Sequence, residues 1–180
     1  MYKVFFILLM IFSSNTTSSK NLFFLDDNSD RIISNYLDTK FLIGRANYSF
    51  LIWNIYDAEL YSNNKMFNSN KYAIILKYNR SISKERLVNE TINDMKEQKK
   101  ISSKKINEWM DLLNSIYQRT DIGKKFIAIR LDLQTSVFYY DGRKIHKSTD
   151  KEFNELFFNI WLRENSKNPE FTRNLLGRKQ

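Results

Sequence analysis

The feature that most constrains the fold is a long apolar and aromatic stretch from Phe41 to Tyr61. Its even positions, except Asn54, suit a buried face, whereas its odd positions are polar or charged near both ends. A period of two predicts β-structure with one face on a core. The alternation is lost between Leu51 and Ile55, which predicts that both faces are covered there. Because strands usually span about 3–10 residues, we expect either two strands meeting near Leu51–Asn54 or one sharply bent strand.

The remaining segments predict further strands and amphipathic helices. Strands are expected at residues 71–78, 125–133, 135–140 and 143–147. Ser83 is the expected N-cap of one helix, and a second helix is expected to start near Ser102 or Ser103. Apolar residues at helical spacing follow both starts, so we expect a helical hairpin packed on a sheet. Residues 20–30 predict an N-terminal segment with little order, and Arg31–Leu37 predict a short strand or turn.

Short local motifs place several turns and helix ends. Asp141-Gly142 predicts a tight hairpin, because Gly tolerates the positive φ that such a turn needs. Thr149 and Glu152 have the spacing of a capping box at the start of another helix. Asn168-Pro169 predicts the start of a last helix, with Gly177 in the position of a C-terminal cap.

The first 19 residues have the order of a secretory signal peptide. Lys3 precedes an apolar run from Val4 to Phe12, and small polar residues follow it. The run is too short for a bilayer, which needs roughly 20 apolar residues. We therefore expect a signal peptide over residues 1–19, a single domain over residues 20–180, and a periplasmic or secreted protein. An uncleaved anchor or a buried N-terminal strand is the alternative, and after signal removal no stable membrane span is expected.

Composition excludes several classes of function. The chain has no Cys and one His, His146, so thiolate catalysis, Cys-based zinc sites and His-rich metal sites are excluded. The net charge of +9 arises from dispersed Lys and Arg, which does not favour nucleic-acid binding. Asp57 and Glu59 share a strand face, but solvated charges are commoner than an acid/base pair. We predict no catalytic residue, no metal and no cofactor. The three tryptophans are expected in the core, or in an aromatic-lined pocket for an apolar ligand.

Four segments, in order, resemble the bacterial chalcone isomerase-like family. The resemblance covers about Gly44–Gly177, and its C-terminal part is the most specific. The segments are GRANYSFLIWNIYDAELY (Gly44–Tyr61), SISKERLVNETINDM (Ser81–Met95), YYDGRKI (Tyr139–Ile145) and ELFFNIWLRENSKNPEFTRNLLG (Glu155–Gly177).

The resemblance implies an α+β fold, an open-faced β-sandwich in which helices pack on one face of a long antiparallel sheet. It also implies export. The superfamily includes chalcone isomerases and non-catalytic fatty-acid binders, in which an Arg on the first hairpin strand serves an anionic ligand. Its expected position falls at Asn47, with Arg45 two residues away on the same strand face. Tyr56 stands where the isomerases have a catalytic Thr and the fatty-acid binders a Tyr.

Three functional hypotheses follow. The leading one is a non-enzymatic domain that binds a small apolar or amphipathic ligand such as a fatty acid, with Arg45, Asn47 and Tyr56 as candidate ligand-binding residues. The second is an isomerase or intramolecular lyase acting on a phenolic or enone-type substrate, with Tyr56 as acid and Arg45 as oxyanion stabiliser. It requires both groups in one cavity. The third is a structural or protein-interaction module without a ligand.

Overall fold

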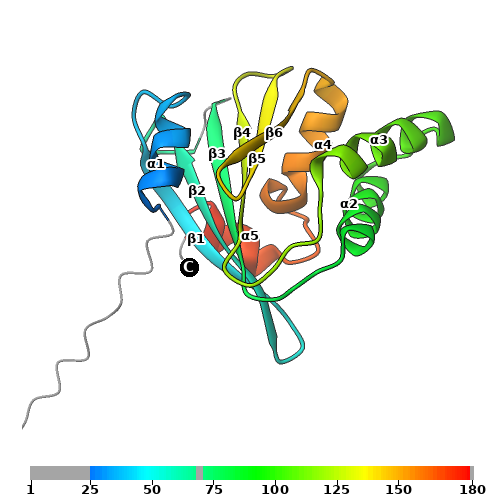
Figure 1. The fold of residues 1–180 in the computed structure, drawn as a ribbon, viewed down its shortest axis with the longest axis horizontal. Helices are drawn as coiled ribbons and strands as arrows, with labels where there is room; N and C mark the ends of the chain where they lie inside the picture. The colour runs from blue at the N-terminus through cyan, green and yellow to red at the C-terminus, as the bar shows by residue number, and fades with distance from the viewer. Residues whose placement is uncertain (1–24, 68–70, 179–180) are drawn as a thin grey trace, which may run out of the picture.

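A six-stranded antiparallel sheet forms the centre of the computed structural model, which describes residues 25–67 and 71–178. The strands lie in the sheet in chain order, each hydrogen-bonded to the next (Figure 1). They are β1 (Phe41–Phe50), β2 (Trp53–Ser62), β3 (Tyr72–Tyr78), β4 (Lys125–Arg130), β5 (Ser136–Tyr140) and β6 (Arg143–Ser148).

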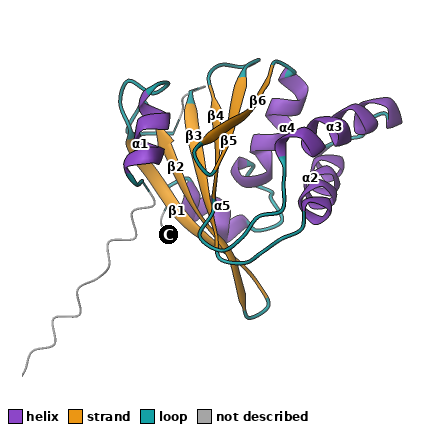
Figure 2. Cartoon of the chain, in the orientation of Figure 1, coloured by secondary structure: helices purple, strands orange, loops and turns teal. Residues whose placement is uncertain are grey.

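Helices cover both faces of the sheet, but unequally (Figure 2). Four helices share the larger apolar core with one face, and a short N-terminal helix packs on the other. The helices are α1 (Asp27–Ser34), α2 (Lys84–Gln98), α3 (Ser103–Ile116), α4 (Lys151–Leu162) and α5 (Pro169–Leu175). The protein therefore has the predicted α+β architecture, an open antiparallel sheet with its main helical layer on one face.

The alternation of side chains along each strand separates two cores. On β2, Ala58 and Leu60 face the main helical layer, whereas Tyr61 faces α1. The aromatic residues Phe153 and Phe157 of α4 fill the main layer against Phe138 of β5, with ring centroids 6.4 and 5.2 Å from that of Phe138. Burial on both faces explains why the central strands have so few polar residues.

Local signals in the sequence placed the starts of α2, α3 and α5 and the turn between β5 and β6. Ser83 and Ser102 accept hydrogen bonds from the backbone amides of Arg86 and Lys105 at the starts of α2 and α3. Asn168 caps α5, with Pro169 as its first residue. Gly142 has a φ of 84° in the β5–β6 turn. These predictions are confirmed, because each depends only on residues within one turn of chain.

Three predictions about local structure are wrong. Residues 27–34 form α1, where little order was expected up to residue 30 and a short strand or turn over Arg31–Leu37. The helix is stabilised because Ile32 and Ile33 pack in the second core. The cap of α4 is Asp150, which accepts from the amide of Phe153. Glu152 does not complete a capping box with Thr149, because its carboxylate pairs with lysines of the neighbouring α2–α3 region.

The third difference from prediction is in the apolar middle of the Phe41–Tyr61 stretch. It forms a two-residue turn at Leu51–Ile52 between β1 and β2, as two strands meeting there would. Both faces were expected to be covered, but Leu51 and Ile52 are 82% and 86% exposed. The hairpin extends past the end of β3, so its tip has no neighbouring strand within the described residues. The predicted signal peptide lies outside the described residues.

Candidate functional site

A cavity of about 620 Å³ opens between the first hairpin and the helical layer. Its sheet wall comes from the ends of β1, β2 and β3, and its other walls come from α2, α4, α5 and the loops before α2 and α5. Apolar and aromatic side chains provide most of the lining, including Leu76, Leu87, Ile160 and Phe171. The volume lies within the roughly 300–1,000 Å³ typical of small-molecule sites.

Aromatic rings of the first two strands form the sheet wall of this cavity. Tyr48 of β1 is paired with Tyr56 of β2, and their rings stack with centroids 5.0 Å apart. The ring of Phe171, from α5, meets both tyrosine rings edge-on. This arrangement follows from the antiparallel register, which places the two tyrosines directly opposite each other on one sheet face.

The hydroxyl of Tyr56 is one of the inner polar groups of the cavity, which also include the buried side chains of Thr91, Asp94 and Tyr117. It accepts a hydrogen bond from Nε1 of Trp161 at 3.0 Å, which leaves its own proton available to donate. Burial raises the pKa of Tyr56 well above its ordinary value, and the nearby Asp94 carboxylate adds to this effect. Tyr56 is therefore a neutral donor at physiological pH rather than a phenolate.

Charged groups at the cavity divide into a paired inner set and an outer set. Asp94 of α2 is buried, and its Oδ1 lies 2.5 Å from Nη1 of Arg163. Arg80 and Arg86 line the outer part together with Glu90, and neither arginine forms an ion pair within 4.0 Å of a carboxylate in residues 25–67 and 71–178. The Arg80 guanidinium lies over the ring of Trp53, 4.0 Å from its centroid. Two arginines against the single carboxylate of Glu90 give the mouth a net positive charge, whereas the inner charges of Asp94 and Arg163 are paired with each other.

The structure does not bring the three predicted ligand-binding residues together. Tyr56 lines the cavity, but Arg45 and Asn47 project from the opposite face of the sheet. Nε of Arg45 lies 2.6 Å from Oε1 of Glu59, which is fully buried and also accepts a hydrogen bond from the Tyr61 hydroxyl at 2.7 Å. The isomerase hypothesis requires Arg45 and Tyr56 in one cavity, and this geometry does not provide that.

Two of the other candidate side chains also have structural partners. Asp57 binds the side-chain amides of Asn47 and Asn79, so it does not form an acid/base pair with Glu59. His146 is half-buried against Phe138, and desolvation lowers its pKa. Residues 25–67 and 71–178 contain no group of three or more His, Asp or Glu side chains that could hold a metal ion.

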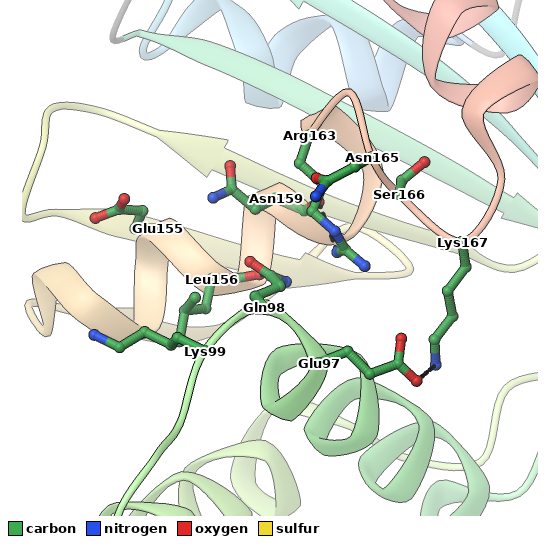
Figure 3. Close-up of a pocket in the computed structure, with 10 residues that line it drawn as sticks. All are labelled: Glu97, Gln98, Lys99, Glu155, Leu156, Asn159, Arg163, Asn165, Ser166 and Lys167. Carbon is green, nitrogen blue, oxygen red and sulfur yellow. Dashed lines mark hydrogen bonds and ion pairs between the residues drawn. The ribbon is translucent and has the colours of Figure 1, made fainter.

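A second hollow, of about 480 Å³, lies between the end of α2, α4 and the loop before α5 (Figure 3). Its lining is mostly polar, and most of its charged groups already have ion-pair partners. Nζ of Lys167 lies 3.0 Å from Oε1 of Glu97. Figure 3 marks this ion pair with a dashed line. Lys99 pairs with Glu152. Because these charges are paired and close to solvent, this hollow is a weaker candidate than the aromatic cavity.

Sequence reasoning missed the arginines at the mouth. Arg80 and Arg86 belong to a loop and a helix N-terminus that approach the hairpin only in the folded chain. The available signal was the run Arg80–Arg86, which carries three cations and one carboxylate directly after a strand. In the tryptophan set, Trp109 and Trp161 are buried as expected, whereas Trp53 is 46% exposed at the cavity mouth.

Comparisons with known proteins agree with the fold. No protein-family model matches the sequence, and no curated protein matches it. Among solved structures, the chain is similar to the Arabidopsis thaliana fatty-acid binding protein AtFAP1, with a TM-score of 0.61 and 11% sequence identity. The match covers 78% of this chain and 88% of AtFAP1. The protein therefore has the chalcone isomerase-like fold, as the resemblance of its sequence segments predicts.

Proposed function

We propose that this protein binds an amphipathic molecule with an apolar tail, such as a fatty acid, without changing it chemically. The observation that carries the proposal is the aromatic cavity of about 620 Å³, which combines an apolar interior with a cationic mouth. An apolar tail inside this space would leave water at roughly 0.8 kcal/mol per buried CH₂ group. The similarity to a fatty-acid binding protein in fold supports this class of ligand.

The charge distribution favours a carboxylate at the mouth. A carboxylate beside Tyr56 would be desolvated near Asp94, and the predicted partner, Arg45, is on the other sheet face. Arg80 and Arg86 at the mouth offer charge-assisted hydrogen bonds without that cost. The ligand then lies with its head outward, and Tyr56 contacts its inner part through the ring and the hydroxyl.

The first test is binding of matched ligands. A fatty acid and the alcohol of the same chain length are titrated into wild type and Arg86→Gln by isothermal calorimetry. We expect Arg86→Gln to weaken the acid roughly five- to tenfold, because it removes a charge-assisted contact. The alcohol should bind both proteins alike. Arg143→Gln, on an exposed strand residue away from the cavity, is the matched control.

Other outcomes would point elsewhere. If the head group lies outward, Tyr56→Phe should reduce the affinity for the fatty acid less than about threefold. A larger loss would indicate that the carboxylate lies inside the cavity, next to Tyr56. Native mass spectrometry that recovers no small molecule, together with no binding across a fatty-acid panel, would contradict the proposal and favour a structural or protein-interaction module.

We also propose that the protein acts outside the cytoplasm, in the periplasm or as a secreted protein. The proposal is supported by the order of charged, apolar and small residues in the first 19 positions. N-terminal sequencing of the protein from its own source checks it. A mature chain that still begins at Met1 would contradict it.

A further inference from the structure

The tip of the first hairpin exposes a continuous apolar group. We define the hairpin tip as Phe50–Trp53, the last residue of β1, the two turn residues and the first residue of β2. All four side chains are large and apolar, and each is at least 46% exposed. Single exposed apolar residues are ordinary on a protein surface, but four in succession at one protruding point favour a contact surface.

The hairpin tip stands clear of the rest of the sheet (Figure 1). β3 ends at Tyr78, which pairs with Tyr56, and Asn79 adds one backbone hydrogen bond to Ile55. Beyond that point, β1 and β2 pair only with each other among the described residues. The hairpin tip can therefore contact a surface outside the protein without any change in the core.

The turn keeps an apolar residue where glycine is easier to accommodate. Leu51 has a φ of 54°, and it is the first residue of a two-residue hairpin loop, a position that usually holds Gly. Left-handed backbone costs an L-residue roughly 1–2 kcal/mol. An exposed Leu at such a position does not stabilise the fold, which is consistent with a role in contact.

The surroundings of the hairpin tip are cationic and suit an anionic lipid surface. The tip itself has no charge, and the adjoining segment Asn79–Arg86 carries Arg80, Lys84 and Arg86 against one carboxylate. The chain as a whole has a net charge of +9. Apolar side chains that enter the acyl boundary, with basic residues level with the headgroups, are typical of interfacial binding. Trp53 belongs to the residue type enriched at that interface.

We propose that the hairpin tip inserts into the surface of an anionic lipid bilayer, with Arg80 and Arg86 on the headgroups. Phe50, Leu51 and Trp53 also line the mouth of the cavity, so docking would place that mouth against the lipid. Docking does not depend on what the cavity binds. No helix in the described ranges combines the length and apolar character that crossing a bilayer demands.

Vesicle sedimentation tests the proposal on the full chain. Vesicles of phosphatidylcholine alone are compared with vesicles that also contain phosphatidylglycerol, with no fatty acid added. We expect binding to the anionic vesicles that weakens with salt. Leu51→Gly/Ile52→Ser should reduce the partition coefficient at least about tenfold, and Arg80→Gln roughly fivefold. Gly suits the φ at position 51, so the double variant should fold at least as well as wild type.

A matched control removes exposed apolar groups elsewhere. Met66→Ser/Leu133→Ser alters the loops at the opposite end of the sheet and should bind vesicles as wild type does. Because the apolar run of residues 4–12 is common to all variants, it cannot produce a difference between them. Brominated lipid should quench Trp53, since Trp109 and Trp161 are buried. Equal binding of wild type and the tip variant, or absent quenching, would overturn the proposal. So would self-association that the tip variant abolishes.

Discussion

At the scale of single residues, the pair of Arg45 and Glu59 is a structural element rather than part of the cavity. Glu59 is fully buried, and Arg45 covers it with a side chain that is 38% exposed. Removing one partner of such a pair leaves a buried charge without compensation, which costs more than the pair itself contributes.

Arg45→Met should therefore lower the free energy of unfolding by about 2 kcal/mol, discounted from the cost at a fully buried site because Arg45 is part-exposed. Urea denaturation measures the change. Arg45→Met/Glu59→Leu should recover much of the loss, because it removes both charges. Affinity for a fatty acid should stay unchanged in both variants, and a selective loss of affinity without loss of stability would return Arg45 to the binding site.

At the scale of elements, α5 depends on the absence of a side chain on β1. A Cβ built on Gly44 would lie 2.2 Å from the carbonyl oxygen of Asn174 and 2.5 Å from that of Leu175. Both obstacles are backbone atoms, so neither can rotate away. The last turn of α5 is thereby held directly on the first strand, and Phe171 is held against the cavity.

Gly44→Ala should cost about 3 kcal/mol of stability, at the upper end for overpacking, and should also weaken ligand binding because α5 shifts. Thermal unfolding and calorimetric titration measure the two effects. Gly123→Ala is the comparison, since a Cβ there meets open space and only the positive φ of 82° opposes it. Equal losses in the two variants would show that packing against α5 is unimportant.

The attachment of α1 should depend on pH. Burial opposes ionisation of Asp26, the cap of α1, but hydrogen bonds from Lys125 and Ser29 outweigh it and lower the pKa from 3.8 to about 2. A carboxyl with a depressed folded-state pKa stabilises the fold above pH 3.8, and this contribution is lost as the pH falls through 2. The protection factors of the α1 amides, which are corrected for the pH dependence of intrinsic hydrogen exchange, should thus fall as the pH drops through that window. Asp26→Asn should remove the dependence, and an unchanged profile would contradict this assignment.

The sequence predicted the helices, strands and turns better than it predicted which side chains of different elements lie together. Ser83, Asn168 and Gly142 act within a few residues, so their positions alone locate caps and turns. The facing of Arg45 relative to Tyr56 depends on the register across a turn without Gly, and the register shifts between Tyr48 and Ser49. A shift of one residue reverses the face. The period-two alternation already placed Arg45 on the polar face and Tyr56 on the core face, and the expectation that both bind one ligand came from the family resemblance instead.

At the scale of the whole molecule, neighbouring strands of the sheet are also neighbours in sequence, whereas the last helix, α5, packs on the first strand, β1. Each strand after β1 pairs with the strand before it in sequence, so the five strand pairings of the sheet can form in the order in which the chain is made. The last helix, however, closes on the first strand through Gly44 and Gly177, whose added Cβ would meet the carbonyl of Ile43. For a protein that acts outside the cytoplasm, as we propose, this arrangement decides when the cavity forms. The cavity lacks one wall until α5 packs on β1, so a ligand can be held only once the segment Pro169–Leu175 has reached the sheet.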